Sequence, residues 1–175
     1  MGKESRGVIV MAKFKVPNVA KLIISLLLCL LAGYLGSIFT TPAIAGWYST
    51  ITKASFNPPN WIFAPVWTAL FLLMGISLYL VWTKGEIKSK RKLIKPALWA
   101  FGIQLALNVL WSILFFGMKS PFYAFIDILV LWAAIFMTIR AFGKVSKAAA
   151  WFLLPYILWV SFAVILNLSI VLLNS

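Results

Sequence analysis

Long apolar runs alternate with short polar segments along almost the whole chain. The runs cover about residues 22–40, 61–82, 96–117, 121–142 and 148–173. A helix that crosses a bilayer needs roughly 20 mostly apolar residues, and each run is close to or above that length. The pattern predicts an all-α integral membrane protein. Residues 1–20 would form a basic N-terminal tail and residues 21–175 a single five-transmembrane-helix bundle.

Composition agrees with a chain embedded in lipid. Hydrophobic residues make up 63% of the 175 residues and charged residues only 11%, whereas a soluble domain has roughly 25% charged residues. The net charge of +13 does not indicate a nucleic-acid partner, because the charges lie between apolar runs. The chain has no histidine and one cysteine, Cys29, so neither a disulfide framework nor a metal site is expected.

The basic residues divide unevenly between the two ends of the predicted bundle. Of sixteen Lys and Arg residues, fourteen precede or open the first run or lie in the connections after the second and fourth runs. Only Lys53 and Lys119 fall at the opposite end. Cytoplasmic loops are enriched in Lys and Arg. We therefore expect the N-terminus inside, the C-terminus outside and a location in the cell membrane.

The first run also has features of a signal peptide. Basic residues precede it, and an Ala-Ile-Ala sequence follows at residues 43–45. However, the run is longer than the roughly 7–15 residues of a signal-peptide core, and cleavage would leave four spans. We expect it to remain as the first transmembrane helix. Either Met1 or Met11 can be the start, because both choices keep a positive flank.

Prolines and one serine predict local features of the helices. Pro96 and Pro121 stand at the starts of their runs, where a missing N–H costs little. Ser146 is placed to cap the fifth helix. Pro155 lies inside the fifth run and should kink it, with neighbouring helices covering the freed carbonyl.

Two pairs of small residues at four-residue spacing permit close helix crossings in a membrane. One pair is Ala32 with Gly36, and the other is Gly102 with Ala106. Such pairs are common in apolar sequence. We take Gly102 and Ala106 as the candidate dimer interface.

A few polar side chains interrupt the apolar runs. Gln104, Asn108 and Ser112 recur every four residues, so they share one helix face, which must point into the bundle. Asp127 is the only acidic residue in any run, and such a carboxylate costs roughly 2.5–3.5 kcal/mol on insertion scales. Asn167 is a further candidate. These groups either hydrogen bond between helices or contact a ligand; for Asp127 both alternatives stay open, and for Gln104 and Asn108 we favour the ligand.

Tryptophan is the other candidate group, with nine residues in the chain. Trp67, Trp111, Trp132 and Trp159 lie well within runs, where an indole N–H needs a partner or the ring faces a cavity. Core packing is the alternative for each of them taken singly. Together with the polar face they favour a cavity.

The connection between the first two runs, residues 41–60, should fold over one mouth of the bundle as a lid. It holds Trp47, Tyr48, Pro58 and Pro59 and a single charge, which makes it too apolar for free solvation. The two prolines fix the backbone in an extended or turn form. Trp67 can then point inward below this lid.

No catalytic set emerges from the sequence. The chain lacks Ser/His/Asp, Cys/His and paired-carboxylate sets and any phosphate-binding glycine loop. An apolar, aromatic pocket with a few amide groups suits a large, flat, apolar ligand. We therefore expect a binding protein with no obligatory cofactor.

Three blocks of the chain resemble a known family. The blocks are GWYSTITKASFNPPNWIFAPVWTALFLLMGISLYLVW, LNVLWSILFFGMKSPFYAFIDILVLW and LLPYILWVSFAVILNLSI. In order and spacing they resemble the TspO/MBR family, the tryptophan-rich sensory proteins related to the mitochondrial translocator protein (peripheral benzodiazepine receptor). The resemblance runs from about Leu22 to the C-terminus.

This resemblance implies a five-helix bundle, often a homodimer, that binds porphyrins such as protoporphyrin IX and haem, or benzodiazepine-site ligands. The protein would act as a tetrapyrrole sensor, scavenger or transporter. A light-dependent porphyrin-degrading enzyme, with Trp67 and Trp159 as redox groups, and a regulatory partner of other membrane proteins are the alternatives. With Tyr48 of the lid, the residues implied to line or support the pocket are Trp47, Pro58, Pro59, Trp67, Gln104, Asn108, Asp127, Trp159 and Ala163.

The chain departs from the family pattern at two places. Phe56 stands where the family usually has a tryptophan in a Trp-x-Pro-Pro motif, which removes an N–H and an easily oxidised ring. No Lys or Arg follows Tyr156, so the sterol-contact pattern of the animal proteins is not supported.

Overall fold

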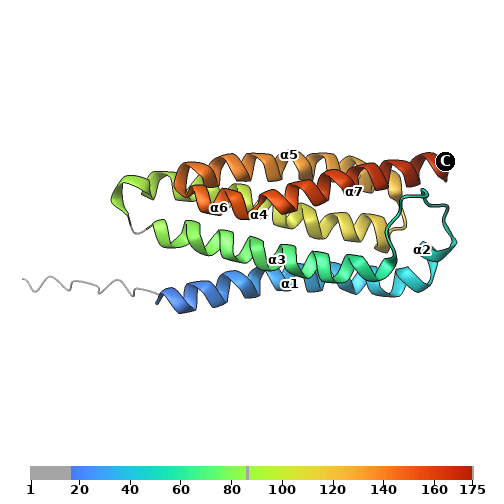
Figure 1. Cartoon of the computed structure of the whole chain (residues 1–175), viewed down its shortest axis with the longest axis horizontal. Helices are drawn as coiled ribbons and strands as arrows, with labels where there is room; N and C mark the ends of the chain where they lie inside the picture. The colour runs from blue at the N-terminus through green and yellow to red at the C-terminus, as the bar shows by residue number, and fades with distance from the viewer. Residues whose placement is uncertain (1–16, 86, 175) are drawn as a thin grey trace, which may run out of the picture.

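The protein is built almost entirely from α-helices (Figure 1). The structure is a computed structural model and describes residues 17–85 and 87–174, so most of the predicted N-terminal tail lies outside the described residues. The elements in chain order are α1 (Asn18–Ala45), α2 (Trp47–Thr50), α3 (Asn60–Lys84), the 3₁₀ turn η1 (Lys88–Lys90), α4 (Arg91–Ser112), the π-helical turn η2 (Ile113–Gly117), α5 (Pro121–Val145), α6 (Lys147–Phe152) and α7 (Leu154–Leu173).

Among the described residues, five helical segments are long and apolar enough to cross a membrane. They are Asn18–Ala45, Asn60–Lys84, Lys88–Gly117, Pro121–Val145 and Lys147–Leu173. These segments confirm the prediction of an all-α, five-span membrane fold. Most of their ends extend past the apolar runs, because helices continue into the polar headgroup region beyond the hydrocarbon core.

The five segments form one elongated bundle, with α1 and α3 along one side and α5 and α7 along the other (Figure 1). Helix α1 packs against α3 and α4, and α5 packs against α4 and α7. The α1–α3 connection and the C-terminus share one end of the bundle (Figure 1), which we call the loop end. The α3–α4 connection with Lys88, Lys90 and Arg91 lies at the other, which we call the basic end.

The four predicted local features, at Pro96, Pro121, Ser146 and Pro155, can be compared directly with the structure. Pro121 is the first residue of α5, as predicted. The prediction for Pro96 is wrong, because α4 begins at Arg91 and contains Pro96. The polar residues before Pro96 extend the helix by more than a turn at the membrane surface, where water can satisfy the carbonyl that a proline leaves free.

The fifth span consists of two helices, α6 and α7, that meet at Leu153 just before Pro155. This break confirms the predicted interruption by Pro155, which cannot donate a backbone hydrogen bond. The Ser146 hydroxyl accepts a hydrogen bond from the Ala149 amide at 3.4 Å, which confirms the predicted cap.

Helices α1 and α3 touch closely in the basic half of the bundle. A methyl group added to Gly75 would lie 2.9 Å from the Leu26 Cα atom, and one added to Gly33 would lie 2.6 Å from the Phe71 ring. Gly75 meets the α1 backbone, so glycine sets the helix separation there, whereas the Phe71 ring beside Gly33 is a side chain that can move. Nearby, the Phe101 and Phe142 rings stack at 5.5 Å.

The two small-residue pairs have different environments. Ala32 and Gly36 are buried, and a methyl group at Gly36 would lie 2.9 Å from the Ser112 hydroxyl of α4. Gly102 and Ala106 are exposed on α4, and a methyl group at Gly102 would meet nothing within 4 Å. The first pair therefore mediates a crossing inside the chain, whereas the second lies on the outer surface of the bundle.

Candidate ligand-binding pocket

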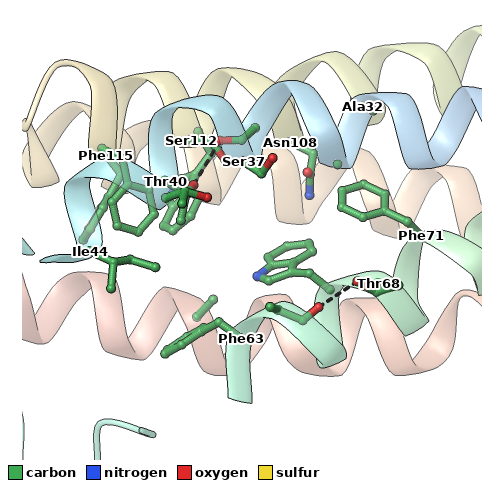
Figure 2. A pocket seen from close by; sticks show the side chains of 18 of the residues that line it. Ala32, Ser37, Thr40, Ile44, Phe63, Thr68, Phe71, Asn108, Ser112 and Phe115 are labelled. Carbon is green, nitrogen blue, oxygen red and sulfur yellow. Dashed lines mark hydrogen bonds between the residues drawn. The ribbon is translucent and has the colours of Figure 1, made fainter. Parts of the chain in front are cut away.

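The loop half of the bundle contains a cavity of about 370 Å³, within the usual size of small-molecule sites. Side chains from α1, α2, α3, α4, η2 and α7 line it. Figure 2 shows Thr40 and Ile44 of α1 facing Phe63 and Thr68 of α3 across the cavity. The separation of α1 from α3 in this half therefore creates the space.

Aromatic side chains form much of the wall. Trp67 of α3 lies 5.7 Å from the Phe71 ring and 6.3 Å from the Tyr156 ring, measured between ring centroids. Trp159 of α7 lies 6.0 Å from the Phe63 ring in an edge-on arrangement. Both indoles line the cavity, where a flat aromatic ligand can stack on or abut them.

Amide side chains supply most of the fixed polar groups of the wall. Asn108 donates from Nδ2 to the Tyr156 hydroxyl at 3.0 Å. The Asn167 Oδ1 atom accepts from the Trp111 indole nitrogen at 3.0 Å, and its Nδ2 atom donates to the Pro121 carbonyl at 2.9 Å. Asn167 therefore joins α7 to α4 and α5 beside the cavity, and the hydrogen bonds fix the orientation of both amides.

An aromatic cluster covers the cavity at the loop end. Phe115 and Phe116 lie in the π-helical turn η2, where the Met118 amide donates to the Ile113 carbonyl at 2.7 Å. The Phe115 ring stacks on Trp111 at 5.0 Å, and Phe116 contacts the Tyr48 ring edge-on at 5.7 Å. These rings separate the cavity from the polar surface at this end.

The α1–α3 connection is fastened over this cluster by side-chain hydrogen bonds. Asn174 accepts from the Thr52 amide and donates to the Thr52 carbonyl, both at 2.9 Å. The Tyr48 hydroxyl donates to Asn57 Oδ1 at 3.1 Å, and the Lys53 ammonium lies 4.8 Å from the centre of the Tyr48 ring. Burial raises the pKa of the Tyr48 phenol, and the Asn57 hydrogen bond lowers it by less, so Tyr48 stays neutral at physiological pH.

Five of the ten residues predicted to bind the ligand line the cavity. They are Tyr48, Trp67, Asn108, Trp159 and Ala163. Trp61 is 73% exposed whereas Trp67 lines the cavity, so the expected inward direction of Trp67 is confirmed.

The other five predicted residues lie away from the cavity wall. Trp47 packs behind it, against Phe115 at 5.7 Å. Pro58 and Pro59 form the backbone that leads into α3 and do not line the cavity. Their contribution in this structure is to set where α3 begins.

Gln104 and Asp127 are buried but do not reach the cavity. Gln104 lies one turn beyond Asn108 towards the basic end, past the level where Gly33 and Phe71 close the space between α1 and α3. Among the described residues, neither polar atom of the Gln104 amide has a hydrogen-bond partner, and the same holds for Asp127 Oδ2. Buried polar atoms in native proteins normally have a hydrogen-bond partner, so these three atoms are exceptions to that rule.

The sequence reasoning missed the contribution of α1. Ala32, Gly36 and Thr40 line the cavity on one helix face, together with the neighbouring Ser37 and Ile44. Their four-residue spacing and small size were visible, but the same spacing fits an ordinary helix crossing. Trp111 also lines the cavity, although the predicted site does not include it.

Within residues 17–85 and 87–174, no group of three His, Cys, Asp or Glu side chains is arranged to hold a metal ion.

Five membrane-length helices around an aromatic pocket define a helical membrane protein with an internal binding site. The TspO/MBR family profile matches residues 25–173. Over 147 residues the chain is 46% identical to the tryptophan-rich protein TspO of Chlorobaculum tepidum, covering 84% of this chain and 91% of that protein. The chain belongs to the TspO/MBR family and is an integral membrane protein.

Relatives span distant organisms. The tryptophan-rich protein TspO of Archaeoglobus fulgidus is 44% identical over 158 residues, which cover 90% of this chain and 99% of that protein. The translocator protein of Homo sapiens is 35% identical over 134 residues, which cover 77% and 78% of the two chains.

Proposed function

We propose that the protein binds a tetrapyrrole, such as protoporphyrin IX or haem, in the loop-half cavity and acts as a tetrapyrrole sensor, scavenger or transporter. The observation that carries the proposal is an apolar cavity with the indoles of Trp67, Trp111 and Trp159 in its wall. Indole rings stack on or abut conjugated planes. Benzodiazepine-site drugs, which are also flat and aromatic, fit the same chemistry.

Polar groups near the cavity suit the edge of such a ligand. The Asn108 amide can hydrogen bond to a polar atom on the ring periphery. Lys53 lies against Tyr48, which lines the cavity at the loop end, so its ammonium can attract the carboxylates that many tetrapyrroles carry. Relatives named "Tryptophan-rich sensory protein" and "Translocator protein" support a role in sensing or transport.

The test is a titration of the detergent-purified protein with protoporphyrin IX, followed by tryptophan quenching and by ligand absorbance. We expect saturable binding that Trp67→Ala weakens by about tenfold, the worth of one stacking contact. Trp61→Ala is the matched control, because Trp61 is exposed and lies outside the cavity wall. Equal loss in both variants, or no saturable binding by the wild type, would contradict the proposal.

Light-dependent porphyrin oxidation is a second candidate function. Trp67 and Trp159 both line the cavity, so an excited ligand bound there would lie against two oxidisable rings. We expect illumination of the complex in air to give a new absorbing product, and Trp67→Phe with Trp159→Phe to abolish it while the dark complex persists. If the product forms at the same rate in the double variant, the tryptophans take no part.

We further propose that the protein lies in the cell membrane with its basic end inside and that it forms a homodimer. The uneven distribution of Lys and Arg supports this orientation. Labelling of single cysteines at Lys53 and Lys88 with a membrane-impermeant thiol reagent in intact cells tests the orientation; only the first should react.

The proposed homodimer rests on a separate observation. The exposed Gly102 and Ala106 on α4 support close contact with a second copy.

A further inference from the structure

Among the described residues, the exposed part of the cavity wall lies along the seam between α1 and α3. Of the residues that line it, six are exposed on the outer surface of the bundle, and all six belong to these two helices. We call this set the α1–α3 window: Tyr34, Ser37, Thr41, Asn60, Ala64 and Thr68. The lining residues of α2, α4, η2 and α7 are buried or half-buried. The opening therefore faces sideways, towards lipid.

Helical periodicity explains how the window forms. On α3, exposed Asn60, Ala64 and Thr68 recur every four residues, and the inward Phe63, Trp67 and Phe71 occupy the neighbouring face. The same pairing of an exposed edge with an inner face occurs on α1 (Figure 2). Residues three or four apart share a helix face, so each helix presents one edge to lipid and one wall to the cavity.

Side chains cover both ends of the cavity in the part of the chain that the structure describes. Towards the basic end, α1 and α3 meet where Gly33 faces the Phe71 ring. At the loop end, the rings of η2 cover the space and the two Asn174–Thr52 hydrogen bonds fasten the connection above them. A ligand that entered under this connection would have to break those bonds, whereas one that entered through the window would not.

The side chains of the window differ from the rest of the lipid-facing surface of α1. Its exposed residues elsewhere include Leu31, Leu35 and Ile38, which suit contact with acyl chains. At the window edges stand Ser37 and Thr41 on α1 and Ala64 and Thr68 on α3. Apart from Tyr34, the side chains of the window are small or polar, and their hydroxyl groups can bind the polar edge of a passing molecule.

We propose that the α1–α3 window is the entrance through which a flat, amphiphilic ligand passes edge-on from the lipid phase into the cavity. The inference rests on the proposed binding of a tetrapyrrole, since that is the ligand we assign to the cavity. It adds that the ligand dissolves in the bilayer first, so that its concentration in the lipid sets the rate of association. The fastened connection at the loop end acts as a fixed cover.

Stopped-flow tryptophan quenching of protein in nanodiscs, mixed with vesicles that carry protoporphyrin IX, measures entry directly. The window variant is Ser37→Phe with Thr68→Phe, which narrows the opening from both edges. The matched control is Leu35→Phe with Leu72→Phe, because these residues are exposed on the same helices and do not line the cavity. Asn174→Ala releases the cover. Thr41→Phe is a single window variant for use if the double variant does not fold.

We expect the window variant to lower the association rate constant by about tenfold. The Leu control and Asn174→Ala should behave as the wild type. Association at the wild-type rate in the window variants would overturn the proposal. Faster association in Asn174→Ala would likewise overturn it, because entry would then pass under the loop.

Pyrene, a flat apolar probe without carboxylates, separates this proposal from the proposed function. If protoporphyrin IX does not bind but the window variant slows pyrene entry, the tetrapyrrole assignment is wrong and the window stands. If protoporphyrin IX binds and neither probe is slowed, the window is wrong and the tetrapyrrole assignment stands. Failure of both probes to bind the wild type would overturn both.

Discussion

The same helices pack tightly in the basic half of the bundle and surround a cavity in the loop half. In the basic half, Gly75 lets α3 reach the backbone of α1 at Leu26, and the Phe101 and Phe142 rings stack on each other. In the loop half, the same pair of helices separates and the space between them is lined by indole, phenyl and hydroxyl groups. Close contact at one end allows separation at the other, so stability and binding reside in different parts of one bundle.

This comparison predicts that the basic half cannot accept added volume. Gly75→Leu should lower the free energy of unfolding by about 3 kcal/mol, because the new side chain meets the α1 backbone rather than a movable side chain. Thermal unfolding in detergent, followed by circular dichroism, measures the loss. Gly102→Leu is the matched control, since a methyl group there meets nothing within 4 Å. Equal melting temperatures for the two variants would contradict the close α1–α3 contact.

In the loop half, a larger side chain should weaken ligand binding and leave the stability of the fold almost unchanged. Ala163→Trp places an indole in the cavity that Ala163 lines, so we expect protoporphyrin IX affinity to fall about tenfold or more, with a change in unfolding free energy below about 1 kcal/mol. The comparison variant is Ala149→Trp, at a fully buried position of the basic half, which should unfold the protein. If Ala163→Trp binds as the wild type does, the ligand occupies another site.

A smaller effect is expected for the amide that joins the helices beside the cavity. Asn167→Leu removes the acceptor for Trp111 and the donor to the Pro121 carbonyl. Hydrogen bonds between membrane helices contribute about 0.6 kcal/mol each on average, so we expect a loss of about 1 kcal/mol in unfolding free energy. Ser161→Ala removes one hydrogen bond between helices, from Trp132, and one within α7, to the Ile157 carbonyl; with one interhelical bond lost, it should cost about half as much. Equal unfolding free energies for the two variants would show that the Asn167 hydrogen bonds do not contribute the expected stability.

The smallest effect on folding should come from the outer face of α4. Gly102→Leu is expected to leave the unfolding free energy within about 0.5 kcal/mol and to lower the dimer fraction, because it fills the surface where a second copy would approach. Light scattering coupled to size-exclusion chromatography measures the mass of the protein–detergent complex. The exposed Ile103→Ala nearby is the comparison, and an unchanged dimer in Gly102→Leu would exclude this face.

The sequence was sufficient to predict the spans and several local features. Apolar run length alone predicts five membrane helices, and the position of Trp67 in its run below the predicted lid predicts that it points inward. Both follow from the geometry of a single helix. The break before Pro155 and the cap at Ser146 are equally local.

Features that depend on contacts between helices could not be predicted in this way. Gln104 and Asn108 share a helix face, yet only Asn108 reaches the cavity, because the place where α1 and α3 close is decided by Gly33 and Phe71 on other helices. For the same reason, the spacing of Ala32 and Gly36 predicts a helix crossing but not that both residues also line the cavity. Helix α1 continues through Pro42 to Ala45, which shortens the predicted lid at its start.

The π-helical turn η2 has a consequence for the evolution of the pocket. A π turn contains one residue more than the α-helix it interrupts, and here it carries Phe115 and Phe116. Deletion of a single residue from this turn would restore a regular α-helix and rotate the residues after it by about 100° relative to Trp111. A relative that is one residue shorter in this stretch would therefore cover its pocket with different rings, and the single gap in an alignment would mark a change of ligand fit.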